Sequence, residues 1–173
     1  SKADRLAHCL LAEPEVEAIG LGARDSLRLE AGLCLHGHEL SADITPIEAG
    51  LNWAIATERR EGGSRPGGYP GAAIIQQQLS EGVARKRVGL RVEGRRPIRA
   101  GATLVDNAGN EVGVICSDAF GASVGGPVAM AFVQSACSQV GSDLHVMVRG
   151  KRVDLKVVRL PMVPNRYYRG YVS

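Results

Sequence analysis

The second half of the chain restricts the fold most, because it consists of short segments in which apolar and polar residues alternate. These segments are residues 88–93, 103–106, 111–117, 128–133, 144–149 and 153–160. Turn-forming residues lie between them, as in Asn107-Ala108-Gly109-Asn110 and Arg149-Gly150-Lys151. A period of two is typical of strands, and short strands separated by turns are typical of antiparallel sheets. The pattern therefore predicts an antiparallel barrel or sandwich.

The first half has a different pattern. Apolar residues at helical spacing predict helices over residues 4–12, 23–33 and 72–85. Shorter apolar patterns predict strands over residues 15–20 and 51–55. The glycine- and proline-rich segment 61–71, EGGSRPGGYPG, predicts a loop or a domain junction. We therefore expect an α+β unit at residues 1–87, followed by an all-β unit at residues 88–173.

Charge and cysteine usage exclude several classes of partner. The net charge is +3, and the arginines are scattered through both halves, so we expect no nucleic-acid partner. No apolar run approaches the roughly 20 residues that cross a bilayer, so we expect no membrane partner.

Four cysteines without a Cys-x-x-Cys pair are typical of reduced, intracellular proteins, and we expect them to be small core residues. His36 and His38 have no third ligand nearby, so we expect no metal site.

Residues 22–53 carry the most constrained chemistry, because charges are interleaved with leucines there. Arg24, Arg28 and Glu30 lie in a stretch whose leucines favour burial. A buried carboxylate is costly unless a cation or several donors meet it. On the residues alone, the partner of Glu30 is either Arg24 or Arg28 within the fold, or a bound ligand.

Specific motifs in this stretch and at the C-terminus point to a family. The run GARDSLRLEAGLCL at residues 22–35 is followed by TPIEAGL at 45–51 and by Trp53. RVGL at residues 87–90 and VPNRYY at 163–168 continue the likeness. Together these motifs resemble the aminomethyltransferase (T-protein) family of the glycine cleavage system, over essentially the whole chain. The resemblance implies the end of an α+β folate-binding subdomain followed by a C-terminal antiparallel β-barrel.

The resemblance also implies an activity in glycine catabolism and one-carbon metabolism. Members of the family transfer the methylene group of aminomethyl-lipoyl H-protein to tetrahydrofolate and release ammonia. The expected cofactor is therefore tetrahydrofolate, and the expected partners are the lipoylated H-protein and the missing N-terminal portion of the same enzyme. The chain has no counterpart of the family's catalytic aspartate, so we assign no catalytic residue and expect the chain alone to be inactive. We expect a cytoplasmic location in a bacterium, or the mitochondrial matrix in a eukaryote.

Three cofactor-binding residues follow from matching the motifs. Glu30 matches the pterin-binding glutamate, Arg59 an arginine that binds folate, and Tyr167 a binding-site tyrosine; Arg60 beside Arg59 leaves the choice of arginine open. A carboxylate can accept two adjacent hydrogen bonds from a pterin, and a guanidinium suits the carboxylates of the folate tail. Tyrosine offers a flat apolar face with a polar tip.

Two alternatives to this reading remain. The chain could be a non-catalytic module that binds folate or a protein, or it could be the folate domain of an enzyme that oxidises sarcosine or dimethylglycine.

Overall fold

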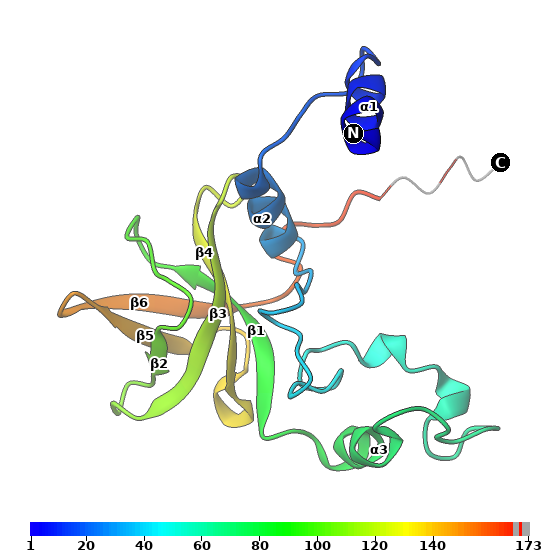
Figure 1. Cartoon of the computed structure of the whole chain (residues 1–173). Helices are drawn as coiled ribbons and strands as arrows, with labels where there is room; N and C mark the ends of the chain where they lie inside the picture. The colour runs from blue at the N-terminus through cyan, green and yellow to red at the C-terminus, as the bar shows by residue number, and fades with distance from the viewer. Residues whose placement is uncertain (168–169, 171–173) are drawn as a thin grey trace.

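A closed antiparallel barrel forms the body of the protein, as the computed structural model shows for residues 1–167 and 170 (Figure 1). Its strands are β1 (Arg85–Val92), β2 (Thr103–Val105), β3 (Glu111–Gly121), β4 (Gly126–Gln134), β5 (Asp143–Val148) and β6 (Lys151–Val158). They pair in the order β1-β4-β3-β2-β5-β6, and β1 also pairs with β6, which closes the ring. All the strands predicted after residue 88 are confirmed, and the sheet is a barrel and not a sandwich.

The barrel interior is built by the inward residues of each strand. In β6, Val153, Leu155 and Val157 are buried and alternate with more exposed neighbours, as the period-two pattern predicts. They join Leu90 and Leu104 in one cluster of apolar side chains. Burying a large aliphatic side chain contributes about 1.5–3 kcal/mol, so this cluster is the main source of the barrel's stability.

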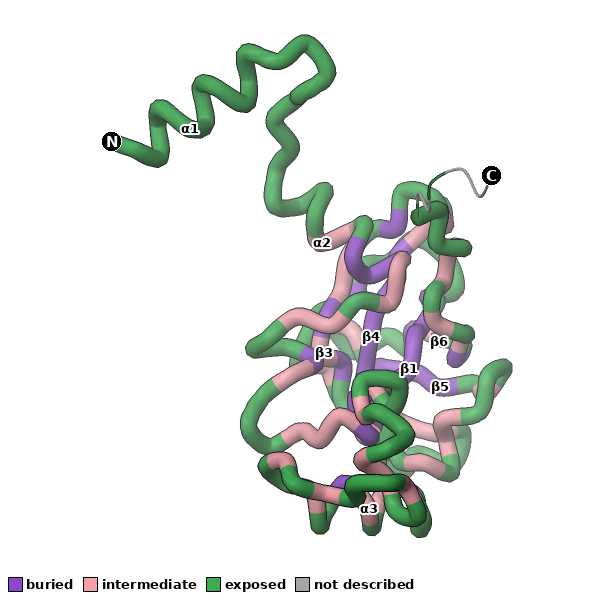
Figure 2. Tube along the Cα trace, turned by 90° about the vertical axis from the view of Figure 1, so that its right-hand side faces the viewer, coloured by how far each residue is buried: buried purple, intermediate pink, exposed green. Residues whose placement is uncertain are grey.

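Strand β4 is buried on both faces, because a helix covers its outer side (Figure 2). The outward residues Val128 and Met130 pack against Leu29 of α2 (Leu21–Glu30) in a second apolar cluster. The predicted helix over residues 23–33 is therefore confirmed, although it begins and ends earlier. This contact fixes the end of α2 on the barrel wall.

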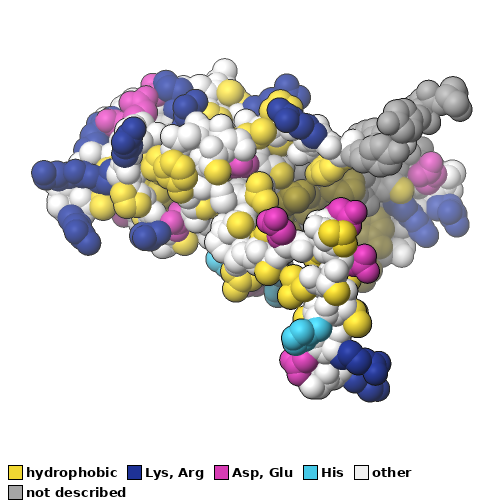
Figure 3. Space-filling view, turned by 90° about the horizontal axis from the view of Figure 1, so that it is seen from above, with side chains coloured by type: hydrophobic (Ala, Val, Ile, Leu, Met, Phe, Trp, Pro, Cys, Tyr) yellow, Lys and Arg dark blue, Asp and Glu magenta, His cyan; other side chains and the backbone are white. Residues whose placement is uncertain are grey.

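Two further helices lie outside the barrel. α1 (Lys2–Leu11) begins with a capping box between Ser1 and Asp4, and it projects from the body with all its residues exposed, Cys9 included (Figure 3). The expectation that Cys9 lies in the core is therefore wrong. α3 (Ala72–Glu81) ends at Gly82, whose φ of 88° stops the helix before the predicted end at residue 85. No helix in the described part of the chain has the length and apolar character needed to cross a bilayer.

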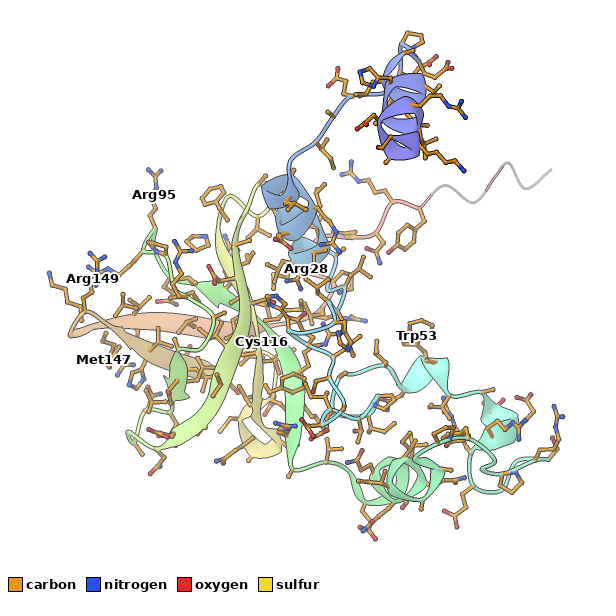
Figure 4. All side chains as sticks on the ribbon, in the orientation of Figure 1. Arg28, Trp53, Arg95, Cys116, Met147 and Arg149 are labelled. Atoms are coloured by element: carbon orange, nitrogen blue, oxygen red, sulfur yellow. The ribbon has the colours of Figure 1, made fainter. Side chains whose placement is uncertain are left out.

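Two strands predicted in the first half are wrong. Residues 15–20 are exposed and pair with no strand among the described residues. Residues 51–55 instead contain the 3-10 helix η1 (Asn52–Ala54), and Trp53 is 78% exposed (Figure 4). The guanidinium of Arg60 donates to the carbonyls of Asn52 and Ile55, so a side chain satisfies the groups that a neighbouring strand would otherwise bond.

Arginines at the start of β1 tie the first half of the chain to the barrel. Arg87 donates through Nε to the carbonyl of Ala49 at 2.7 Å and through Nη1 to that of Gly32 at 2.9 Å. Arg85 forms an ion pair with Glu48 at 2.8 Å. These contacts hold the segment after α2 against β1, and they set the position of the residues at the end of α2.

Candidate functional site

Glu30 is the last residue of α2, at the point where the helix meets the turn between β3 and β4. Its side chain is 3% exposed. Earlier in the helix, Ser26 donates its hydroxyl to the carbonyl of Phe120 at 2.6 Å, and Leu29 packs into the second cluster. The helix therefore presents the carboxylate of Glu30 to the barrel and not to open solvent.

Main-chain groups of two other segments hold Glu30. Its Oε1 accepts hydrogen bonds from the backbone N–H of Ser123 at 2.7 Å and of Val124 at 2.9 Å. Its carbonyl oxygen accepts from the backbone N–H of Met162 at 2.8 Å and of Val163 at 3.2 Å. Backbone donors from the barrel and from the segment after β6 thus satisfy one carboxylate oxygen and the carbonyl.

The second carboxylate oxygen of Glu30 is available. Oε2 has no hydrogen-bond partner among the described residues. A carboxylate that is held at one oxygen and has no partner at the other among the described residues can accept a ligand's N–H groups at that second oxygen.

The ion pair between Glu30 and Arg24 or Arg28 is not found among the described contacts. Arg28 instead pairs through Nη1 with Oε2 of Glu39 at 2.8 Å, and it donates to the hydroxyl of Ser117 at 2.8 Å. It also contacts Asp25 at 3.4 Å. Arg28 and Asp25 therefore support the fold beside Glu30, and no cation among the described residues forms an ion pair with the carboxylate of Glu30.

The thiol beside this pair is unsuited to nucleophilic chemistry. Cys116 donates to Oε1 of Glu39 at 3.3 Å and to the carbonyl of Met130 at 3.1 Å. Burial, and then the negative charge of Glu39, raise the pKa of the Cys116 thiol well above its ordinary value. Burial also raises the pKa of Cys34. In the described residues, no group of three or more His, Cys, Asp or Glu side chains could hold a metal ion.

The other two predicted ligand residues lie in different places. Arg59 belongs to η2 (Thr57–Arg59), on the side of the molecule away from α2, and its guanidinium donates to the carbonyl of Gly67 at 3.2 Å (Figure 1). Tyr167 is 59% exposed and follows Val163, whose amide bonds to Glu30, by four residues. The fold thus brings the segment of Tyr167 to Glu30, and it keeps Arg59 in a separate region. Tyr168 lies outside the described residues.

A hollow of about 550 Å³ adjoins the segments that hold Glu30. The residues whose amides bond to Glu30 line it, together with Arg91 of β1 and Arg159 after β6. Another hollow, of about 450 Å³, lies at the barrel end that is distant from α2, and its walls include Arg96, Arg99, Arg149 and Lys151. Arg149 points outward there (Figure 4).

Sequence reasoning missed the residues that support the site. The sequence pattern does not indicate that Glu39 and Ser117 are the partners of Arg28, although a buried arginine requires an acid and further acceptors. The side chains of Ser123 and Val124 do not indicate that their backbone amides bond to Glu30. The glycines at 121, 125 and 126 mark the turn that presents these amides, and they were the only signal available.

Comparison with known proteins agrees with this architecture. The family profile described as "Glycine cleavage T-protein C-terminal barrel domain" matches residues 85–164, and "GCVT N-terminal domain" matches residues 1–59. Curated relatives include the mitochondrial aminomethyltransferases of Dictyostelium discoideum, 44% identical, and Gallus gallus, 45% identical. Each alignment covers 96% of this chain, and it covers 42% and 41% of the two relatives, so the chain spans about two fifths of their length.

A solved structure supports the same assignment. The glycine cleavage system aminomethyltransferase T from Bartonella henselae superimposes with a TM-score of 0.88 and is 47% identical. The match covers 97% of this chain and 45% of that protein. Two profiles from one family, these relatives and this structural match lead to one assignment: the chain belongs to the glycine cleavage T-protein family and corresponds to its C-terminal portion.

Proposed function

We propose that this chain forms the pterin-binding part of an aminomethyltransferase that acts in glycine cleavage. The complete enzyme transfers the methylene group of aminomethyl-lipoyl H-protein to tetrahydrofolate and releases ammonia. The names of the relatives support the activity. The N-terminal portion that this chain does not match supplies the catalytic aspartate. The enzyme works in the cytoplasm of a bacterium or in the mitochondrial matrix of a eukaryote.

The availability of Oε2 of Glu30 carries the proposal. A pterin presents a ring N–H and an exocyclic amine side by side. Because Oε1 already accepts two amides, Oε2 is the oxygen that accepts from these donors. Each hydrogen bond to a charged group contributes about 1.5–3 kcal/mol. Because the turn holds Oε1 and leaves Oε2 without a partner among the described residues, the carboxylate is oriented before the ligand arrives, and little side-chain entropy is lost on binding.

Tyr167 and Arg59 are proposed for the rest of the ligand. What supports Tyr167 is its exposed ring on the segment that bonds to Glu30. Arg59 keeps most of its N–H groups free of protein acceptors in the described residues, so it can bind the carboxylates of a folate tail. Arg60 uses two of its N–H groups on main-chain carbonyls, which favours Arg59 of the two.

Glutamine is the informative substitution at Glu30. It keeps an oxygen for the amides of Ser123 and Val124, and it replaces the accessible acceptor with an NH₂ group that opposes the ligand's donors. Alanine would also leave those two amides without a partner and would weaken the fold. We expect Glu30→Gln in the complete enzyme to lose at least about tenfold in tetrahydrofolate affinity by calorimetry.

The matched control is Glu58→Gln, because Glu58 is an exposed acid in η2. It should bind tetrahydrofolate as the wild type does, and both variants should unfold at nearly the wild-type temperature. Equal affinity of Glu30→Gln and wild type would refute the proposal.

A further inference from the structure

We propose that the barrel turn of residues 121–126 positions the Glu30 carboxylate for its ligand, and that Gly121 is the residue that permits this. The inference rests on the proposed function, because the position of the carboxylate matters only if Glu30 binds a ligand. It makes Gly121 a positioning residue, which acts through Glu30 and touches no substrate.

The donors in this turn belong to the backbone. The N–H groups of Ser123 and Val124 are successive, and both point at Oε1 of Glu30, at 2.7 and 2.9 Å. Two adjacent amides directed at one oxygen form a small anion-binding concavity. Substitution of these two side chains leaves the donors in place, so the geometry depends on the path of the turn and on the space around it.

Gly121 provides that space. A Cβ atom at this position would lie 2.8 Å from Oε1 of Glu30, closer than real Cβ contacts occur. The same atom would lie 3.3 Å from Cβ of Val124 and from Cγ1 of Val128. Val128 is fully buried, so its side chain has little room to shift away from an added Cβ atom. The carboxylate of Glu30 is therefore the group that must move.

The backbone at Gly121 would accept another residue. Its φ does not lie in the left-handed region, so an alanine there is not strained by the backbone itself. The cost of Gly121→Ala therefore comes from the contact with Oε1 and from the side chains of Val124 and Val128. The glycine is needed for the close approach of the carboxylate and not for the turn.

The same turn contains a matched control. Gly126 faces Gly121 across the β3–β4 ladder, and a Cβ atom there would meet nothing within 4 Å. Its φ also lies outside the left-handed region, unlike that of Gly125, which is 76°. Gly126→Ala thus adds the same methyl group to the same turn without touching Glu30.

The site consequently joins the two halves of the chain. The carboxylate comes from α2, and the groups that orient it come from the barrel. Binding sites lose affinity when a contact group moves by a fraction of an ångström to one ångström. The barrel is therefore a direct determinant of pterin affinity.

A double-mutant cycle in the complete enzyme tests this inference. Tetrahydrofolate affinity is measured by calorimetry for wild type, Gly121→Ala, Gly126→Ala, Glu30→Gln and the double variant Glu30→Gln/Gly121→Ala. We expect Gly121→Ala to lose about tenfold or more, and Gly126→Ala to stay within about twofold of wild type. In the Glu30→Gln background, Gly121→Ala should cause no further loss, because the oxygen that accepts from the ligand, Oε2, has already been replaced.

The outcomes separate the inference from the function on which it rests. Wild-type affinity of Gly121→Ala, with weak binding of Glu30→Gln, would overturn the role of Gly121 and leave the proposed function intact. Equal losses from Gly121→Ala in both backgrounds would show an effect on the fold and would also overturn it. Wild-type affinity of Glu30→Gln would refute the function itself.

A second variant covers the case in which Gly121→Ala does not fold. Glu30→Asp keeps the charge but withdraws the carboxylate from the turn by one methylene. If the turn sets the position, Glu30→Asp should bind tetrahydrofolate as weakly as Glu30→Gln. Full affinity of Glu30→Asp would show that the position is not critical, and it would overturn the inference.

Discussion

Arg28 and Glu39 form an ion pair inside the protein, between the end of α2 and the barrel wall. Nη1 of Arg28 lies 2.8 Å from Oε2 of Glu39, and the two side chains are 9% and 0% exposed. Both partners make further hydrogen bonds, to Ser117 and to the amide of Leu35. Such a pair is costly to form, but its members depend on each other once it is buried.

Removal of Glu39 should therefore destabilise the fold strongly. Glu39→Ala leaves the guanidinium of Arg28 buried with only its longer contact to Asp25 at 3.4 Å, so we expect a loss of about 3–5 kcal/mol in the free energy of unfolding, measured in urea. The exposed pair Arg152–Asp154 is the control, and Asp154→Ala should cost less than about 1 kcal/mol. Equal losses in the two variants would contradict the importance of burial.

The cysteines should differ in their reactivity. Burial and the charge of Glu39 raise the pKa of Cys116, so at pH 8 its thiolate fraction is far smaller than that of an ordinary thiol. Cys9 is exposed on α1. We expect a thiol reagent to label Cys9 rapidly and Cys116 slowly, as followed by mass spectrometry, with both labelled at similar rates in denaturant. Fast labelling of Cys116 in the folded protein would contradict this packing.

Glu48 should make stability depend on pH. Burial opposes the charged form, but the N–H of Thr45 and the guanidinium of Arg85 lower the pKa of Glu48 below its ordinary value of 4.5. A carboxylate whose pKa is lowered by folding stabilises the protein above the unfolded pKa, and this contribution is lost as the pH falls through the folded pKa. Glu48→Gln should therefore be less stable than wild type at pH 7, and the difference should shrink below about pH 4. A difference that stays constant down to pH 3 would disprove this assignment.

Gly113 should resist substitution. A Cβ atom on Gly113 would lie 2.9 Å from Cα of Val133 and would also contact the carbonyl of Phe132, so it meets backbone that cannot move aside. We expect Gly113→Ala to lower the free energy of unfolding by about 1–3 kcal/mol or more. Gly126→Ala serves again as the control, and similar stabilities of the two variants would argue against the tight β3–β4 contact.

The isolated chain should show no catalytic turnover. Because the proposed catalytic aspartate belongs to the portion that this chain does not match, the purified 173-residue polypeptide should release no ammonia from aminomethylated H-protein. The complete enzyme is the positive control in the same assay. Turnover by the chain alone would place the catalytic group within these residues.

Local patterns were sufficient to predict the barrel strands and the helices. In β6, the apolar residues Val153, Leu155 and Val157 are the ones that face the barrel interior. The alternation of apolar and polar side chains along a strand does not depend on the rest of the fold, so it can be read from the sequence. The same rule failed at residues 51–55, where Asn52–Ala54 form η1 and Arg60 donates to the carbonyls of Asn52 and Ile55. The spacing of apolar residues does not show whether a segment has a neighbouring strand with which it can pair.

The site was predictable only in part, for a related reason. Motif matching selected Glu30, but its donors lie 93 and 94 residues further along the chain. Those donors are main-chain amides that every residue type carries, so no letter of the sequence identifies them. The pairing of Arg28 with Glu39 likewise depends on how the loop after α2 folds back on the helix.

The hydrogen bonds from Met162 and Val163 to the carbonyl of Glu30 also set an order of events during synthesis. α2 is synthesised before the β3–β4 turn, and the turn is synthesised before the segment after β6. The ring cannot close before β6 exists, because β1 must pair with it. A nascent chain therefore carries Glu30 without these contacts until the segment after β6 has been made, and ligand affinity should develop only then.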